Sequence, residues 1–380
     1  MPGSDKLKIG ITCYPSVGGS GILATALGDE LARREHQVHF ISYERPFRLP
    51  AETSHLRFHS VGINDYGLFK YPDYTLPLSV RMAEVSRDFG LDVLHVHYAV
   101  PHATAAILAK AMLPPQQQPR VVTTLHGTDT TLLGRDTDYV PAIRHALMNS
   151  DAITTVSHFL KRETQMLLNI DKPIDVIHNF FSPRRPKRTR QQVRNDLGVE
   201  DNEALLIHCS NLRPVKRIDL LLKTVAAIRP RDSFKMVILA GEVFSQFNDH
   251  VRQLGLEDRI IVHEKANDVE EYMQAADIGL VSSEMESFCL SILEGMCFGC
   301  PSVATRVGGI PEVVDDNQTG LLVPFGDAGA LSRAVESLIR DIPRRQALGQ
   351  AGKQQARLRF SAEVIVPQYE ALYRRVCQRQ

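Results

Sequence analysis

The chain has 380 residues, of which 43% are hydrophobic, and 44 basic residues balance 44 acidic residues at a formal net charge of zero. This length suffices for two domains of ordinary size, and the balanced charge argues against nucleic acid as the main partner. No apolar run approaches the length of a membrane span, and the first residues lead into a strand and not into a secretory signal, so we expect a cytoplasmic protein without membrane spans.

The six cysteines lie mostly in apolar surroundings, which is typical of reduced, buried thiols in a cytoplasmic protein. Cys297 and Cys300 have the Cys-x-x-Cys spacing of redox enzymes. However, they follow a predicted helix, whereas a helix N-terminus is the place that lowers the pKa of a thiol. The sequence therefore gives little support for a redox function.

The first half of the chain alternates predicted strands with predicted helices. Strands are expected at residues 8–13, 38–41, 56–61, 93–97, 121–125, 152–156 and 176–177. This order favours a parallel sheet with right-handed crossovers. A glycine turn at residues 17–21 precedes a predicted helix over residues 22–34, whose N-terminus favours an anion. Its glycines lack the dinucleotide-binding spacing, and a tight turn without a ligand is the alternative.

Side chains with polar rings lie in or just after two of these strands. His95 and His97 alternate by two residues and share one face, but no third ligand stands at metal-binding spacing, so ordinary histidines near a sheet edge are the alternative. Tyr98 follows the same strand. His126 follows the strand at residues 121–125, where it is either a ligand or a structural histidine. Residues 64–77, rich in Tyr, Pro and Asp, are predicted to form a long binding loop.

A short basic segment with two prolines, residues 182–190, marks the predicted domain boundary. We interpret it as a solvated linker, with a phosphate site as the alternative. The first domain is therefore expected to span residues 1–185 and the second residues 186–361.

In the second half the pattern restarts with a strand at residues 204–210 and a helix at residues 218–228, followed by strands at 236–241 and 260–262 and a helix at 330–340. Arg213 and Lys216 lie between the first strand and its helix. Two cations beside the positive end of a helix dipole suit a diphosphate. Two ordinary surface cations are the alternative.

Residues 278–281 form a short apolar run that predicts a buried parallel strand. Glu286 follows this strand, and Glu294 lies inside the next predicted helix, which Gly299 and Pro301 end. A turn holds the first carboxylate and the helix holds the second, so both can reach one polyhydroxy ligand at the carboxyl edge of the sheet. Two solvated surface acids are the alternative.

This stretch resembles the Glu-x7-Glu signature of the retaining glycosyltransferases of family 4. As in that family, it is followed by Gly299-Cys-Pro301 and by Gly308-Gly-Ile-Pro-Glu312. Arg213 and Lys216 resemble the family's diphosphate clamp, and the His-Gly-Thr-Asp sequence at 126–129 resembles its sugar-facing histidine loop. The sequence Gly-Glu-Val-Phe-Ser at 241–245 departs from the family's usual glycine-rich turn.

The resemblance covers nearly the whole chain and implies an α/β fold of the GT-B type, with two doubly wound, Rossmann-like domains facing a central cleft. It implies a retaining hexosyltransferase that requires neither a metal ion nor another cofactor. In this architecture the final helix, within residues 362–380, packs back on the first domain.

A narrower resemblance, at residues 10–21, 94–98 and 123–129, is to the subgroup of this family that acts in bacillithiol biosynthesis. It implies UDP-N-acetylglucosamine as the donor and L-malate as the acceptor. The residues implied to carry catalysis are His126, Arg213, Lys216 and Glu286. Those implied to bind the donor are Gly19, Ser210, Asn211, Arg213, Lys216, Lys265, Glu286, Ser287, Phe288 and Glu294. Those implied to bind malate are Gly19, Ser20, Tyr98, Thr124 and Arg144.

Four alternative functions remain open from the sequence. They are transfer of the same sugar to inositol phosphate, a nucleotide-sugar epimerase on the same fold, a lipid glycosyltransferase at a membrane surface, and a binding module without catalysis. The lipid enzyme would need a basic and apolar patch on the first domain, which the sequence does not clearly contain. A screen of acceptors separates these alternatives. A homo-oligomer is also compatible with the sequence.

Overall fold

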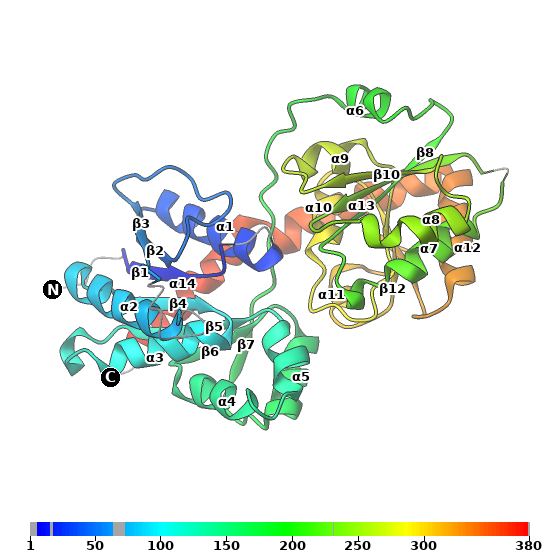
Figure 1. Cartoon of the computed structure of the whole chain (residues 1–380). Helices are drawn as coiled ribbons and strands as arrows, with labels where there is room; N and C mark the ends of the chain where they lie inside the picture. The colour runs from blue at the N-terminus through cyan, green and yellow to red at the C-terminus, as the bar shows by residue number, and fades with distance from the viewer. Residues whose placement is uncertain (1–5, 16–17, 64–72, 231, 379–380) are drawn as a thin grey trace. The chain divides into compact units, whose positions relative to one another are not determined.

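The computed structural model describes residues 6–15, 18–63, 73–230 and 232–378. The chain forms two compact units (Figure 1): unit 1 holds residues 1–179 and 362–380, and unit 2 holds residues 180–361. Each unit is built on a parallel sheet with helices between the strands, so the predicted α/β class is confirmed. The predicted glycine turn and the predicted binding loop fall partly outside the described residues, at 17 and at 64–72.

In unit 1 the described strands form one parallel sheet in the order β3-β2-β1-β4-β5-β6-β7. The strands are β1 (Lys8–Thr12), β2 (Gln37–Ser42), β3 (Leu56–Ser60), β4 (Val93–His97), β5 (Arg120–Leu125), β6 (Ala152–Thr155) and β7 (Ile174–Val176). The chain first builds outward from β1 through β2 and β3, and then returns to the other side of β1 with β4. Open α/β sheets bind ligands at the carboxyl ends of the strands where the order reverses, here between β1 and β4.

The helices of unit 1 follow its strands along the chain. They are α1 (Gly19–Arg33), α2 (Thr75–Phe89), α3 (Thr104–Ala111), α4 (Val140–Asn149) and α5 (His158–Leu168), joined by the C-terminal α14 (Ala362–Gln378). The central strand β4 is buried along its whole length, because helices cover the sheet. Its sequence, Val-Leu-His-Val-His, is therefore buried although two of its five residues are histidines.

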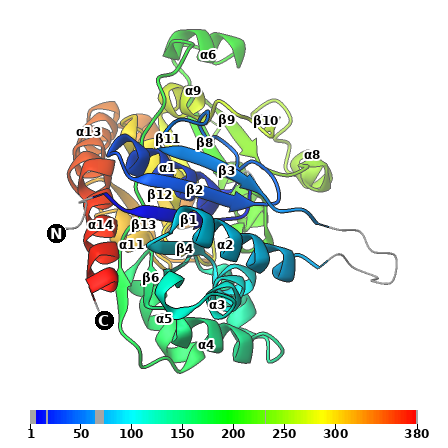
Figure 2. The same cartoon turned by 90° about the vertical axis from the view of Figure 1, so that its left-hand side faces the viewer.

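The C-terminal helix α14 belongs to unit 1, where it packs against α1 and β5 (Figures 1 and 2). The hydroxyl of Tyr373 hydrogen-bonds Nδ1 of His95 over 2.7 Å, in the middle of the sheet. His36, which directly precedes β2, donates from Nε2 to the carboxylate of Glu370 over 2.9 Å. The last helix thus joins unit 1 through buried polar contacts as well as apolar packing.

Unit 2 repeats the same construction with the strand order β10-β9-β8-β11-β12-β13. The strands are β8 (Ala204–Ser210), β9 (Phe234–Ala240), β10 (Ile260–Glu264), β11 (Ile278–Val281), β12 (Ser302–Thr305) and β13 (Gly320–Val323). The helices are α6 (Arg190–Asp196), α7 (Ile218–Ala226), α8 (Asn248–Gln253), α9 (Val269–Ala275), α10 (Leu290–Cys297), α11 (Ile310–Val313), α12 (Ala328–Arg340) and α13 (Ile342–Phe360). The strand order reverses between β8 and β11.

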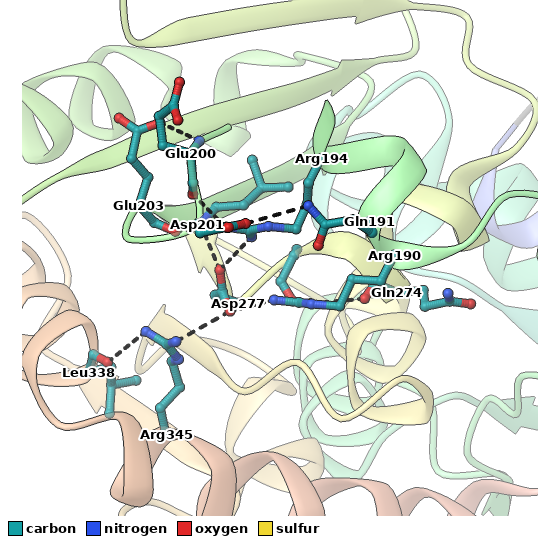
Figure 3. Close-up of polar contacts among 12 residues, drawn as sticks. Arg190, Gln191, Arg194, Glu200, Asp201, Glu203, Gln274, Asp277, Leu338 and Arg345 are labelled. Atoms are coloured by element: carbon teal, nitrogen blue, oxygen red, sulfur yellow. Dashed lines mark hydrogen bonds and ion pairs between the residues drawn. The ribbon is translucent and has the colours of Figure 1, made fainter. Parts of the chain in front are cut away.

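The division between the units lies at residues 179–180, before the predicted boundary at 185–186, and residues 182–190 belong to unit 2. Arg184 forms an ion pair with Glu270 at 3.1 Å, and Arg188 forms one with Glu271 at 2.5 Å. Both glutamates are buried. The basic segment begins just after this division and most of its residues are exposed, as expected for a solvated linker, while ion pairs tie two of its arginines to unit 2. Helix α6 begins where this segment ends, and its Arg190 and Arg194 both donate to the carboxylate of Asp277 (Figure 3).

Candidate functional site

In unit 2 the predicted donor residues follow the two strands at the point where the strand order reverses. Arg213 and Lys216 follow β8, and Glu286 follows β11, which is the neighbour of β8 in the sheet. Because the strands are parallel, both connections leave the same edge. This places the two parts of the predicted donor site together.

Lys216 and Glu286 form the centre of this region. Nζ of Lys216 lies 2.6 Å from Oε1 of Glu286, which also accepts a hydrogen bond of 2.7 Å from the hydroxyl of Ser283. Burial alone would lower the pKa of the Lys216 ammonium, but the Glu286 carboxylate outweighs it and raises this pKa above its ordinary value. The sequence predicted separate roles for the lysine and the glutamate, whereas the structure joins them in one ion pair.

The connection after β11 holds the connection after β8 in place. The hydroxyl of Ser282 donates to the backbone oxygens of Lys216 and Arg217 over 2.9 and 3.0 Å. The backbone N–H of Glu284 donates to the oxygen of Val215 over 2.8 Å. Ser282 and Ser283 were not among the predicted site residues, although their position after a predicted buried strand is a signal that could have identified them.

The Gly-Gly-Ile-Pro-Glu loop at residues 308–312 contacts the backbone of Glu286. Gly309 N–H donates to the backbone oxygen of Glu286 over 2.8 Å. Gly308 has a φ of +55°, and a Cβ at that position would lie 2.0 Å from the same oxygen. Only a residue without a side chain permits this approach. The family signature therefore has a packing reason, since it fixes the backbone that carries Glu286.

Ser210 is the last residue of β8, and Asn211 follows it. Nδ1 of His208 lies 2.9 Å from the oxygen of Leu280, and because a carbonyl only accepts, this nitrogen carries the proton. Nε2 of His208 then accepts from the hydroxyl of Ser210 over 2.8 Å. Oδ1 of Asn211 is buried and has no hydrogen-bond partner among the described residues. A buried oxygen without a partner is costly, which suits an atom that receives a ligand's donor.

The other predicted donor residues differ in how they are placed. Glu294 is buried on α10, and Ser287 is half-buried beside Glu286. The ring of Phe288 packs edge-on against Phe360 at 5.5 Å and belongs to the core, so only its backbone can face a ligand. Lys265 is exposed after β10, two strands away from β8. Lys216, Glu286 and Ser283 thus form one group, and Lys265 lies two strands away from it at the carboxyl edge of the sheet.

In unit 1 the structure brings together Ser20, Tyr98 and His126 at the corresponding reversal of strand order. The hydroxyl of Tyr98 donates to Oγ of Ser20 over 3.0 Å, and the rings of Tyr98 and His126 lie 5.3 Å apart. Gly19 begins α1 and is exposed, and no side chain caps the first turn of this helix among the described residues. Backbone N–H groups and the helix dipole at this point suit a carboxylate.

Asp129 organises the turn that carries His126. Its carboxylate accepts from the backbone N–H of Ala99 and that of Gly127, each over 3.2 Å, and so ties the turn after β4 to the turn after β5. Burial raises the pKa of Asp129 to about 6, against the effect of these N–H donors. Asp129 is the last residue of the His-Gly-Thr-Asp sequence and was not among the predicted site residues. Its burial is a consequence of the two turns, which the sequence alone does not show.

His95 and His97 are core residues of the central strand β4, so their interpretation as histidines near a sheet edge is wrong. Nε2 of His95 lies 2.6 Å from Oγ1 of Thr124, and Nδ1 bonds Tyr373, so both ring nitrogens of His95 have protein partners and neither is left for a metal.

The side chains of Thr124 and Arg144 have protein partners of their own, although the backbone oxygen of Thr124 accepts from the N–H of Tyr98 over 2.9 Å. The hydroxyl of Thr124 is fully buried and also lies 2.6 Å from Oγ1 of Thr154, inside the sheet. Arg144 is exposed on α4 and donates to the backbone oxygen of Leu168 over 3.3 Å, which ties α4 to the end of α5. The Thr124 side chain therefore has no surface to offer a small acceptor, since it serves the core.

The family described as Glycosyltransferase Family 4 matches residues 17–185, and the family described as Glycosyl transferases group 1 matches residues 189–355. The chain is 42% identical, over 97% of both chains, to the N-acetyl-alpha-D-glucosaminyl L-malate synthase of Bacillus anthracis. The chain belongs to the glycosyltransferase family of that synthase. A D-inositol 3-phosphate glycosyltransferase of Corynebacterium aurimucosum is 32% identical over 51% of this chain and 48% of its own.

Solved structures share the fold of this glycosyltransferase. Anabaena Alr3699/HepE, solved in complex with UDP-glucose, aligns with a TM-score of 0.81 at 19% identity and covers 96% of this chain and 99% of its own. WaaG, a glycosyltransferase involved in lipopolysaccharide biosynthesis, aligns with a TM-score of 0.75 at 14% identity, covering 96% and 99%. The predicted GT-B class is thus confirmed. Among the described helices of this glycosyltransferase, none has the length and apolar character needed to cross a membrane.

Acid should destabilise this glycosyltransferase, because several histidines are buried in the neutral form. Burial lowers the pKa of His102 and His208 to about 4, and the pKa of His95 and His126 to about 3. The unfolded chain takes up protons near pH 6.5, so each histidine contributes stability that is present above this pH and is lost as the pH falls toward the folded pKa. We expect a loss of about 2 kcal/mol per histidine at pH 5, measured by urea unfolding at pH 7.5 and 5.

Asp129 acts in the opposite sense, since its raised pKa of about 6 adds stability as the pH falls below that value. It is one group against the four histidines named above and also His39 and His97, whose pKa values burial lowers too, so the sum keeps its sign. The exposed His145 offers a control: His145→Asn should leave the slope of stability with pH as it was, whereas His208→Asn should reduce it. A free energy of unfolding that is constant or rises between pH 7.5 and 5 would contradict this account.

Proposed function

We propose that this glycosyltransferase transfers N-acetylglucosamine from UDP-N-acetylglucosamine to the hydroxyl of L-malate, with retention at the anomeric carbon and without a metal ion. The observation that carries the proposal is the 42% identity, over 97% of both chains, to the N-acetyl-alpha-D-glucosaminyl L-malate synthase of Bacillus anthracis. The two groups of polar residues at the strand reversals of the two units support it, because they suit a sugar diphosphate and a carboxylate respectively.

The diphosphate of the donor is assigned to Arg213 and Lys216. The charge that develops on the leaving UDP needs stabilisation, and the cationic Lys216 at the edge of unit 2 can supply it without a metal ion. The ammonium of Lys216 has three N–H donors, so it can bond a phosphate oxygen while it holds Glu286. The carboxylate of Glu286 is proposed to accept hydrogen bonds from the sugar hydroxyls.

Other residues are proposed to bind the nucleoside and the sugar. Glu294 is proposed to accept from the ribose hydroxyls, and Asn211 to offer its unpaired Oδ1 to a donor on the nucleotide. His126 is proposed to contact the transferred sugar. Lys265, at the exposed end of β10, would lie toward the base.

The two malate carboxylates are assigned to the start of α1. Gly19 and Ser20 provide N–H groups in the first turn of a 15-residue helix, and the hydroxyls of Ser20 and Tyr98 lie together beside it. The guanidinium of Arg144 is a further candidate because it is exposed. The malate hydroxyl attacks the anomeric carbon from the face that UDP leaves, and its proton passes to the leaving phosphate. This route gives the α-anomer without a nucleophilic carboxylate.

The proposal is tested by incubating the full chain with UDP-N-acetylglucosamine and L-malate in the presence of a chelator. We expect release of UDP and formation of a glycosylated malate, detected by mass spectrometry, at a rate that the chelator does not lower. Parallel reactions contain inositol phosphate or no acceptor. UDP release with inositol phosphate and not with malate would overturn the malate assignment, and conversion of the donor without any acceptor would indicate an epimerase.

Transfer to inositol phosphate is the second candidate. It is favoured by the 32% identity to the D-inositol 3-phosphate glycosyltransferase of Corynebacterium aurimucosum, which extends over about half of each chain. The malate assignment ranks first because its relative matches over nearly the whole length of both proteins.

We further propose that the reaction takes place in the cytoplasm. The six cysteines are all free in the structure, including the buried Cys13, Cys289 and Cys300. Free thiols are typical of a reducing compartment.

A further inference from the structure

His126 contacts one of three buried histidines that lie in or just after β4 in unit 1. His95 and His97 lie on β4, His102 lies just after it, and all three are buried. Burial lowers the pKa of each of these three rings and that of His126. Each ring is therefore neutral at pH 7 and carries one proton, which sits on either Nδ1 or Nε2. The position of that proton decides whether a ring donates to a ligand or accepts from it.

His97 and His126 share one hydrogen bond. Nδ1 of His97 lies 2.8 Å from Nε2 of His126. Two arrangements satisfy this contact. Either His97 donates from Nδ1, which leaves the proton of His126 on its Nδ1, or His126 donates from Nε2, which forces the proton of His97 onto its own Nε2.

The surroundings of His97 distinguish the two arrangements. Nε2 of His97 is buried and has no hydrogen-bond partner among the described residues. In the second arrangement this nitrogen would be a buried N–H without an acceptor, whereas in the first it is a bare lone pair. Orphaned buried N–H groups are rarer in folded proteins than under-satisfied acceptors. The first arrangement is therefore the more stable one.

The backbone of His97 is itself held by His102. Nδ1 of His102 lies 2.5 Å from the backbone oxygen of His97, and because the carbonyl only accepts, His102 donates. The rings of His95 and His97 lie 4.6 Å apart, and His95 is fixed on both sides by Thr124 and Tyr373. The ring of His97 therefore stands among fixed neighbours, which suits a residue that orients another.

We propose that His97 is a positioning residue that fixes the tautomer of His126, so that His126 offers an Nδ1–H donor and no free lone pair. The ligand atom it meets is then an acceptor, such as a hydroxyl or carboxylate oxygen. His126 binds and orients this oxygen but does not take a proton from the attacking hydroxyl, because its only lone pair in the ring plane is occupied by His97. The assignment of that oxygen to the sugar or acceptor rests on the proposed function.

The tautomer is measured directly in the full chain without substrate. Histidine is labelled with ¹⁵N, long-range ¹H–¹⁵N spectra are recorded at pH 7.5, and the His126 signals are identified by their loss in His126→Asn. We expect a protonated-type Nδ1 and an unprotonated-type Nε2 for His126. The reverse pattern, or two protonated nitrogens, would overturn the inference. This readout needs no acceptor, so it remains decisive if the malate assignment fails.

Kinetics then separate positioning from a structural role. His97→Leu removes the donor, and we expect kcat to fall about tenfold with a smaller change in KM for the donor substrate. His97→Asn keeps an N–H donor close to the place of Nδ1 and should recover most of this loss. Equal losses in both variants, or losses that follow their thermal stability, would reject positioning. If neither variant folds, the spectrum of the unaltered protein decides alone.

Discussion

Replacing Lys216 with alanine is expected to lower kcat/KM by about 10²–10³-fold, since a single donor to charge in the transition state contributes this much in other enzymes. Lys216 is the cation that the structure fixes beside Glu286, at 2.6 Å, whereas Arg213 is exposed. Its loss removes the charge that balances the departing diphosphate. Initial rates of UDP release at varied donor concentration measure the effect, and the loss should fall mainly on kcat.

The matched control is Lys223→Ala, which removes an exposed lysine on the next helix, α7. It should leave both kinetic constants within about twofold, because exposed charges contribute little. Retained activity in Lys216→Ala would contradict the assignment of the diphosphate.

The Lys216 variant also leaves Glu286 buried without its cation, so a fall in stability must be separated from the loss of transition-state binding. Ser283 still donates to the carboxylate, which limits the damage. The double variant Lys216→Ala with Glu286→Gln removes the uncompensated charge and should regain stability without regaining activity. A double variant that regained activity would show that the lysine acts only through folding.

The fold could be predicted because its strands are short apolar runs covered on both faces. Runs such as residues 204–210 and 278–281 are recognisable without any knowledge of their partners, and polar residues after them mark the carboxyl edge. The order of the strands in the sheet could not be predicted in this way. The sequence of one strand does not show whether the strand lies at the centre or at the edge of a sheet, so the predicted edge position of His95 and His97 was wrong.

The candidate site could be predicted in its residue types but not in its contacts. Lys216 and Glu286 were both nominated, yet their ion pair joins residues 70 positions apart, and only the adjacency of β8 and β11 brings them together. The resemblance implied that Thr124 binds the acceptor, whereas its hydroxyl belongs to a buried polar chain that includes a residue of α14. Side-chain direction and long-range pairing are the properties that local patterns do not carry.

The ion pairs of the basic residues at 182–194, which contribute to stability, could not be predicted from the sequence either. In sequence they form a charge run, but in the structure they meet acids that lie some 80 residues further on. Asp277 is the clearest case (Figure 3). Arg194 donates to its Oδ2 over 2.9 Å, Arg190 to its Oδ1 over 2.7 Å, and Arg345 to its Oδ1 over 3.3 Å. The cluster joins the first helix of unit 2 to β11 and α13.

Asp277→Asn is therefore expected to destabilise unit 2 by about 3–5 kcal/mol, the usual cost of breaking a buried ion pair by removing one partner. The side chain of Asp277 is 9% exposed and that of Arg194 is 6% exposed, so the guanidinium would keep its charge in a poorly solvated place. Oδ2 also accepts from the backbone N–H of Leu205 over 2.8 Å, and an amide nitrogen at that position would face donors only. Urea unfolding, followed by far-ultraviolet circular dichroism, measures the loss.

A surface pair provides the comparison for this prediction. Asp249, which is 81% exposed, pairs with Arg252 one turn along α8, and Asp249→Asn should change stability by less than about 1 kcal/mol. Equal effects of the two substitutions would show that the Asp277 cluster is no stronger than an exposed pair. The double variant Asp277→Asn with Arg194→Met tests the cause, since it removes the stranded charge while keeping an apolar stem. If burial of an unpaired guanidinium is what costs free energy, this double variant must be more stable than Asp277→Asn alone.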